Sequence, residues 1–185
     1  MRKVLVTPAT FQPMDVEEVK LRPEVRGLTT PDDDPILLAA MRSAVEAYEG
    51  FTEHVLCLST WDVFLDTWPD SGESIELPAP LSTVSSLNYR DGVGTWQIMD
   101  STHYVVDTTS PIKGRVSLAY SQSWPSIYSE INVIRVRFIA GFADSETIPF
   151  RVKDGILYKI QELYDGIDRR GLYEPCWVAD ARLPV

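Results

Sequence analysis

The stretch that decides the fold is Ser110–Phe142, which reads SPIKGRVSLAYSQSWPSIYSEINVIRVRFIAGF. Its pattern predicts two β-strands, Arg115–Tyr120 and Asn132–Phe138, joined by a polar loop that contains aromatic residues. The second strand is rich in β-branched and aromatic side chains, which favour a buried sheet position. Because Arg135 and Arg137 alternate with these apolar residues, one face of the strand is expected to contact water.

The sequence changes from strand to helix after this stretch. Gly141 ends the strand, and Pro149 stands at the start of a helix that we expect to run from about 149 to 165, where Gly166 ends it. Gly155 inside a helix costs about 1 kcal/mol relative to Ala, so close packing against another helix is its expected reason. The apolar stripe of this helix comprises Val152, Ile156, Ile160, Leu163 and Tyr164.

Two further helices are predicted before the strands. Residues 1–13 are expected to form an extended arm, and a short helix near 15–22 follows with Asp15 as its N-cap. A longer helix near 35–50 begins with Asp34 as N-cap and Pro35 at its first position, and Gly50 is its expected end. Its apolar face comprises Leu37, Met41, Ala44, Tyr48 and Phe51.

The region 55–142 carries strand patterns separated by turn residues. We expect six to eight short strands, mostly antiparallel because the connections are short. Val84–Arg90 and Thr95–Met99 flank Asp91-Gly92-Val93-Gly94, which predicts a hairpin. The remaining expected strands lie at 60–66, 75–77 and 104–106. The fold class is therefore α+β, a small helical bundle with an inserted, mostly antiparallel β-region.

Composition limits the class of protein. With 185 residues, of which 44% are hydrophobic, the chain can form one domain, or one domain with an insertion, around a real core. No apolar run approaches the roughly 20 residues that span a bilayer, so we expect no membrane partner, and the apolar stretch after Met1 is too short for a signal peptide. Two distant cysteines, Cys57 and Cys176, favour a reducing compartment, although a disulfide between them stays open.

The net charge is −10, from 27 acidic and 17 basic residues. Proteins that grip duplex DNA neutralise phosphates with clustered Lys and Arg, and here the basic residues are scattered. The charge therefore disfavours a DNA-binding protein. Solubility alone is a sufficient reason for the acidity.

The sequence contains no recognisable catalytic, cofactor or metal motif. His54 and Cys57 have the spacing of zinc ligands, but a second pair is lacking, and a helix end is the expected place for His54. Asp32, Asp33 and Asp34 lack the alternating spacing of a calcium loop and fit a helix cap better. Trp61, Trp68, Trp96 and Trp124 are expected in a core or an interface, and a carbohydrate-binding or hydrolytic β-module is the alternative that they leave open.

The order and spacing of several short motifs resemble a known family, the head–tail connector proteins (adaptors, or head-completion proteins) of long-tailed phages and phage-derived gene transfer agents. The motifs are Met14-Asp15-Val16-Glu17-Glu18-Val19-Lys20, Gly114-Arg115-Val116, Gln122-Ser123-Trp124-Pro125 and Val136-x-Phe138-Ile139-Ala140-Gly141-Phe142. The resemblance covers nearly the whole chain up to its C-terminal segment.

The resemblance implies a structural protein that acts without catalysis or cofactor. It implies a homo-oligomeric, dodecameric ring at the head–tail interface of a virion or phage-like particle, made in the bacterial cytoplasm. The ring would contact the portal protein and a tail-side connector or stopper protein. DNA would pass through it without specific binding, and an acidic wall would repel the duplex over about a Debye length of 8 Å.

The expected organisation has four parts: an N-terminal arm with helices (1–54), the inserted β-region (55–142), a helix that completes the bundle (143–166) and a C-terminal arm (167–185). The last segment is apolar but has neither helical nor strand period. It is expected either to fold back on its own domain or to dock as an extended arm on the portal, as the resemblance implies. The candidate partner-binding residues are Leu172, Tyr173, Trp177, Val178, Leu183 and Val185.

Overall fold

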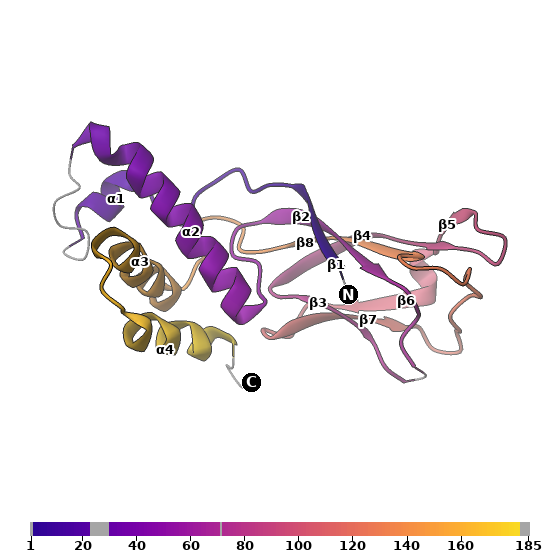
Figure 1. The fold of residues 1–185 in the computed structure, drawn as a ribbon. Coiled ribbons are helices and arrows are strands. Elements are labelled where there is room, and N and C mark those ends of the chain that lie inside the picture. The colour runs from indigo at the N-terminus through magenta and orange to yellow at the C-terminus, as the bar shows by residue number, and fades with distance from the viewer. Residues whose placement is uncertain (1, 23–29, 71, 182–185) are drawn as a thin grey trace. The chain divides into compact units, whose positions relative to one another are not determined.

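A computed structural model of the chain describes residues 2–22, 30–70 and 72–181, with side chains up to 178. Within these ranges it contains four α-helices and eight strands in two antiparallel sheets, so the predicted α+β class is confirmed (Figure 1). The chain divides into two compact units. Residues 1–10 and 58–141 form the β-unit, and residues 11–57 and 142–185 form the helical unit.

The β-unit contains a five-stranded and a three-stranded sheet, and every paired strand is antiparallel to its neighbour. The larger sheet has the order β1 (Arg2–Thr7), β2 (Ser59–Leu65), β8 (Ile134–Ala140), β4 (Leu81–Arg90) and β5 (Trp96–Ile98). The smaller sheet has the order β3 (Ile75–Pro78), β7 (Lys113–Leu118) and β6 (Tyr104–Asp107).

Alternation along β8 determines which face of the larger sheet is buried. Ile134, Val136 and Phe138 are fully buried, whereas Arg135 and Arg137 are only partly covered, as the sequence predicts. The two sheets approach closely at Gly114 of β7, where an added Cβ would lie 2.3 Å from a methyl carbon of Leu81 in β4. Apolar burial between the sheets therefore forms the core of this unit.

One expectation about the strands needs correction, and the placement of two strands in the sheets was not predicted. Arg2–Thr7 was expected to be an extended arm, but it forms the edge strand β1, because its register against β2 extends the larger sheet. The two strands of the opening stretch, β7 and β8, lie in different sheets, so the loop between them crosses from one sheet to the other. The hairpin of β4 and β5 around Asp91–Gly94 is confirmed.

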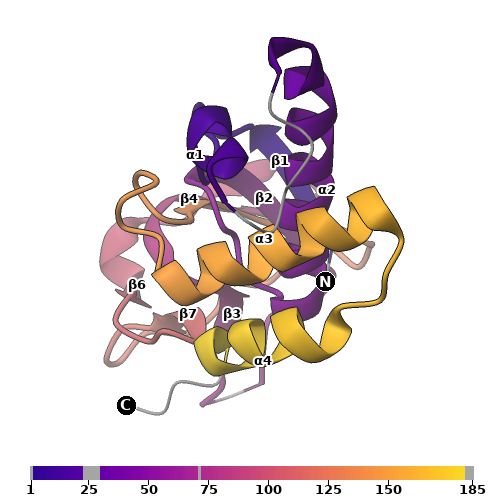
Figure 2. The same ribbon diagram turned by 90° about the vertical axis from the view of Figure 1, so that its left-hand side faces the viewer.

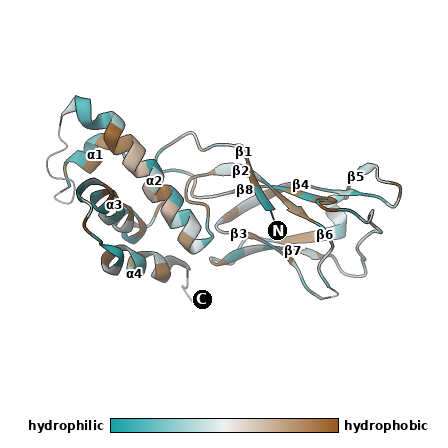
Figure 3. Cartoon of the chain, in the orientation of Figure 1, coloured by the Kyte–Doolittle hydropathy of each residue, from teal (hydrophilic) through white to brown (hydrophobic). Residues whose placement is uncertain are grey.

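The helical unit contains α1 (Val16–Lys20), α2 (Asp34–Thr52), α3 (Phe150–Asp165) and α4 (Arg170–Ala181). Figure 2 shows α3 and α4 running side by side, with α2 packed against them. Along α2, bands of hydrophobic and hydrophilic residues alternate (Figure 3). The buried apolar residues of the helices are Val19, Leu37, Met41, Ala44, Tyr48, Val152, Ile156, Leu157, Ile160, Tyr173 and Trp177.

The ends of α2 differ from the prediction. Its N-cap is Asp33 rather than Asp34, because a 3-10 turn over Pro31–Asp33 precedes the helix and Thr30 donates to the Asp33 carboxylate at 2.7 Å. The helix continues through Gly50 to Thr52, and Glu53 adopts the left-handed conformation (φ 59°) that ends it. Phe51 is therefore helical but remains 44% exposed.

The other helix ends agree better with the sequence. Asp15 caps α1 by accepting a hydrogen bond from the Glu17 N–H at 2.7 Å, and α1 ends at Lys20. Helix α3 begins after Pro149 and ends at Gly166 (φ 72°), as predicted. Two residues of its expected apolar stripe, Leu163 and Tyr164, are about half exposed, because the buried face ends at Ile160.

Candidate interaction surfaces

The C-terminal segment, which was predicted without helical period, forms the helix α4 as far as Ala181. Its start is fixed by Asp168, whose carboxylate accepts from the Arg170 N–H at 3.0 Å. The expectation of an extended arm over Ile167–Val185 is wrong for residues 170–181. The signal that was missed is the spacing of four between Tyr173 and Trp177, which Pro175 obscured because proline normally disfavours a helix interior.

The six candidate partner-binding residues lie in three kinds of place. Tyr173 and Trp177 are buried in the helical unit, at 5% and 1% exposure. Leu172 is 51% exposed, and Val178 is half-buried. Leu183 and Val185 lie outside the described residues. The segment therefore folds back on its own unit through its two aromatic side chains, while Leu172 still faces outward.

Trp177 is the centre of an aromatic cluster that joins two helices, α2 and α4. Its ring centroid lies 4.5 Å from that of Tyr173, 5.8 Å from that of Tyr48 in an edge-to-face arrangement, and 6.0 Å from that of Phe51. Aromatic pairs at these distances contribute about 0.5–1.5 kcal/mol each beyond the area they bury. The cluster thus attaches α4 to α2.

Gly155 provides the place in α3 where Trp177 fits. A Cβ added at Gly155 would lie 2.4 Å from the indole nitrogen of Trp177 and 3.2 Å from the Cβ of Cys176. No real side chain tolerates such a distance, so only glycine lets the two helices approach this closely. The close helix packing that the sequence predicted for Gly155 is confirmed, and its partner is α4.

A polar network also joins α3 to α4. Lys159 donates to a Glu162 oxygen at 2.5 Å and to the Tyr173 hydroxyl at 3.3 Å, and the second Glu162 oxygen accepts from the Arg169 N–H at 2.7 Å. Burial raises the pKa of Glu162, but the hydrogen bonds from Lys159 and Arg169 outweigh it, so the pKa lies below its usual value of 4.5. Burial lowers the pKa of Lys159, but the hydrogen bonds to Glu162 and Tyr173 outweigh burial. The pKa of Lys159 therefore lies above its usual value.

The tryptophans of the β-unit bear on the carbohydrate alternative. Trp68 and Trp124 stack face to face, with centroids 4.4 Å apart and planes 7° from parallel, and the Trp68 indole donates to the Pro125 carbonyl at 2.8 Å. Trp61 donates to Ser59, and the Lys3 ammonium lies over its ring. A sugar platform needs open ring faces, so these three rings serve the β-unit itself. Trp96 is the exception, at 41% exposure.

The residues that were considered for chemistry do not converge. His54 is buried just after the end of α2, as predicted, and His103 lies in an exposed 3-10 turn. Cys57 and Cys176 do not form a disulfide, and burial together with the nearby Glu49 raises the pKa of Cys57 to about 12. Within the described ranges, no three His, Cys, Asp or Glu side chains are grouped so that they could hold a metal ion.

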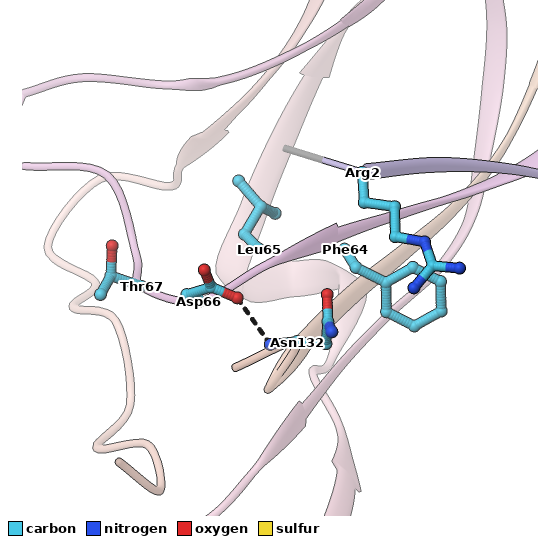
Figure 4. A pocket seen from close by; sticks show the side chains of 6 residues that line it. All are labelled: Arg2, Phe64, Leu65, Asp66, Thr67 and Asn132. Atoms are coloured by element: carbon cyan, nitrogen blue, oxygen red, sulfur yellow. Dashed lines mark hydrogen bonds between the residues drawn. The ribbon is translucent and has the colours of Figure 1, made fainter. Parts of the chain in front are cut away.

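A shallow pocket in the β-unit lies at the end of β2, and its volume is about 370 Å³ (Figure 4). Arg2, Phe64, Leu65, Asp66, Thr67 and Asn132 line it. The Asp66 carboxylate accepts from the Asn132 N–H at 2.6 Å and so holds Asn132 in its left-handed conformation (φ 57°). Asp66 thus has a structural task, and histidine, cysteine and lysine are missing from the lining.

Sequence reasoning missed one group of residues on the larger sheet, in which exposed Trp96 lies beside two half-buried arginines. Trp96 lies opposite Arg90 in the register of β4 and β5, and the guanidinium groups of Arg90 and Arg135 lie 5.3 and 5.5 Å from the centroid of its ring. The alternation of arginines along β8 was visible in the sequence. Their partner Trp96 was not, because the strand order that brings β8 and β5 to either side of β4 has no local signal.

No helix in the described part of the chain is both long and apolar enough to cross a bilayer. The architecture is that of an α+β fold in which two sequence-distant segments build a helical unit and the chain between them builds most of a two-sheet β-unit. Solved structures of particles contain chains with this fold.

Chains of gene transfer agent (GTA) particles share the fold. A chain of the virion of a native GTA particle has a TM-score of 0.77 and 23% sequence identity, covering 98% of this chain and 95% of that one. A chain from the neck of an empty GTA particle, computed with C6 symmetry, has a TM-score of 0.72 and 23% identity over 95% of both chains. A chain from the neck of a native GTA particle, computed with C12 symmetry, has a TM-score of 0.74 and 18% identity over 100% of this chain and 97% of that one.

At these identities the likeness to chains of GTA virions and necks is one of fold. No protein-family model and no curated protein matches the chain. The similarity in fold extends over nearly the full length, so it includes α4 as well as the β-unit.

The fit between Gly155 and Trp177 gives a first prediction. We expect Gly155→Ala to lower the free energy of unfolding by up to about 2 kcal/mol, because overpacking at a buried contact costs about 1–3 kcal/mol and the gain in helix propensity returns only about 1 kcal/mol. The matched control is Gly50→Ala in α2, where an added Cβ meets no atom within 4 Å and where we expect a small gain in stability. Urea unfolding of both variants measures the difference. Equal stabilisation by both substitutions would contradict the close contact.

The network around Glu162 gives a prediction on pH. A carboxyl whose pKa is lowered in the folded state contributes stability above its unfolded pKa, and the contribution disappears as the pH falls through the folded value. We expect Glu162→Gln to cost about 1.5–3 kcal/mol at pH 7 and progressively less as the pH falls below 4.5. Urea unfolding at several pH values tests this, with exposed Glu146→Gln as control. A cost of Glu162→Gln that stays constant down to pH 3 would refute the ionic role of Glu162.

Proposed function

We propose that the chain is a structural adaptor at the head–tail junction of a phage or phage-like particle. The observation that carries the proposal is the shared fold, which extends over almost the full length of both chains in comparisons with neck and virion chains of GTA particles. A fold shared over so much of the length leaves little of the chain for a separate catalytic domain. The proposed role is assembly without bond-breaking chemistry.

The proposed assembly is a dodecameric ring. It is supported by the neck of the native GTA particle, which was computed with C12 symmetry. A closed ring requires that each copy present two different surfaces, one to each neighbour, because its contacts are head-to-tail. The portal protein would lie on the head side of the ring, and a connector or stopper protein on the tail side.

The distribution of charge supports a channel for DNA. The helical unit has 10 basic and 18 acidic residues and a net charge of −8, whereas the β-unit has 7 basic and 9 acidic residues and a net charge of −2. Copies of an acidic unit arranged around a channel would repel the phosphates of a passing duplex. DNA would then pass without binding to the ring.

The portal contact is proposed for the outward side of α4 and the residues that follow it. Leu172 is half exposed and Val178 is half-buried, so both can contribute apolar area to a partner. Leu183 and Val185 follow in the sequence and belong to the same proposed surface. Tyr173 and Trp177 have a different task, because their burial holds α4 on the helical unit while its other side faces the portal.

The proposal predicts that the chain, mixed with its portal protein, adds a ring of twelvefold density to the portal in cryo-electron microscopy. Leu172→Glu should prevent the complex, because a charge in an apolar contact must be desolvated without a partner. The control is Leu21→Glu, the same substitution at a leucine that is 86% exposed at the end of α1. We expect Leu21→Glu to bind as the unchanged chain does.

Two results would count against the proposal. If the unchanged chain forms no complex with the portal at micromolar concentrations, the adaptor role is wrong. If the complex forms and Leu172→Glu binds as tightly as Leu21→Glu, the adaptor role stands and the portal contact lies elsewhere. Thermal unfolding of both variants separates lost binding from lost folding.

A further inference from the structure

The outer face of the larger sheet is the face that turns away from the core of the β-unit. Because directly opposed residues share a face, the register places Asn88, Arg135 and Ile98 side by side on it, with Arg90 and Trp96 one pair further along β4 and β5. The same register places Phe64 opposite Arg135 and Arg2 opposite Phe64. Four arginines, Arg2, Arg90, Arg135 and Arg137, therefore lie on one face, which we call the arginine face.

Half of these arginines are already neutralised within the β-unit. Arg137 forms a two-bond ion pair with the Asp62 carboxylate, both at 2.8 Å, and Arg90 donates to Glu130 at 2.8 Å. Arg2 and Arg135 form no ion pair with any carboxylate in the described ranges of the chain. The β-unit as a whole has a net charge of −2, so two unneutralised cations on one face make that face locally positive.

The arginine face also contains unsatisfied polar atoms. The Nε atoms of Arg90 and Arg135 and the Oδ1 atom of Asn88 are buried without a hydrogen-bond partner among the described residues. The described β-unit has no other side-chain atom of this kind. Two of the three belong to the arginines beside Trp96, and the third belongs to Asn88, one pair along β4 and β5. A buried unsatisfied donor or acceptor costs about 1–3 kcal/mol. Because the β-unit itself covers these three atoms, a partner reaches them only where the side chains around Trp96 shift on binding.

The unsatisfied atoms indicate the chemistry of the missing partner. Two Nε donors call for an acceptor, and a carboxylate offers two acceptor oxygens in the geometry that guanidinium groups bind best. The Oδ1 atom of Asn88 calls for a donor, which a backbone or amide N–H provides. The exposed ring of Trp96 and the side chain of Ile98, which is 75% exposed, add apolar area around the polar atoms.

We propose that the arginine face, with Trp96 at its centre, binds the acidic helical unit of a second copy of this chain. The proposal rests on the proposed adaptor function, because a ring places two copies of the chain side by side. Charge complementarity supports this occupant, because the helical unit has a net charge of −8. Three of its exposed carboxylates, Asp32, Glu46 and Glu146, form no ion pair among the described residues.

A protein partner fits the face better than a nucleic acid. The phosphodiester backbone offers acceptors only, so it would leave Asn88 Oδ1 unsatisfied. The carboxylates of Asp62 and Glu130 lie on or beside the arginine face and would repel phosphate. A protein surface can present a carboxylate beside an N–H donor, and so it can satisfy both kinds of atom at once.

Sedimentation equilibrium of the full-length chain at low and high salt tests this binding. We expect the unchanged chain to self-associate more weakly as salt rises, because charge pairs at an interface are screened. Arg135→Glu should weaken self-association by about tenfold or more, as loss of one partner of an interfacial charge pair does. Trp96→Ala should weaken it by about as much, because it removes the aromatic ring at the centre of the contact. The matched control is Arg115→Glu, an equal change of charge in β7 of the smaller sheet, where Arg115 pairs with Asp107 at 2.7 Å.

Several results would overturn the inference. They are a chain that stays monomeric at hundreds of micromolar in low salt, self-association that ignores salt, and equal effects of Arg135→Glu and Arg115→Glu. Salt-dependent binding of DNA that Arg135→Glu abolishes would assign the face to nucleic acid instead. The portal complex is measured separately, so a failed arginine face and a failed adaptor role give different results.

Discussion

The helical unit depends on one contact, in which the indole ring of Trp177 lies against the bare backbone of Gly155. Glycine at that position makes α3 itself less stable than alanine would. In return, α4 packs into the space that a side chain at residue 155 would fill. The same indole contacts the rings of Tyr48 and Phe51 from α2, so a single side chain joins the helix before the β-region to the two helices after it. The network of Lys159, Glu162 and Tyr173 adds polar bonds beside this aromatic contact.

The sequence predicted those features of the fold that depend on residue spacing within a single helix, strand or hairpin. The stripe of α3 as far as Ile160, the end of α3 at Gly166, the alternation along β8 and the Asp91–Gly94 hairpin all follow from local residue spacing. Residues 2–7, which were predicted as an arm, form β1 because they pair with β2 at the edge of the larger sheet. This pairing joins residues that are far apart in the sequence. The unsatisfied group around Trp96 depends on strand order and was equally invisible from the sequence.

The burial of Trp177 changes how the C-terminal segment can act. An arm that becomes ordered only on its partner would lose conformational entropy at the moment of binding. Because the segment is already folded as α4, Leu172 lies on a preformed surface. The proposed portal contact would therefore cost less conformational entropy. In the proposed ring, the acidic helical unit of one copy and the arginine face of the next would supply complementary charges.

The central claim is that the C-terminal segment belongs to the helical core in the free protein. Hydrogen exchange of the unbound chain, followed by mass spectrometry or NMR, tests it most directly. The account predicts that the amides of residues 173–178 exchange with protection comparable to those of residues 154–160 in α3, since the Gly155–Trp177 contact couples the opening of the two helices. Exchange of the 173–178 amides at nearly the rate of an unfolded peptide, while α3 stays protected, would contradict the claim and restore the free docking arm.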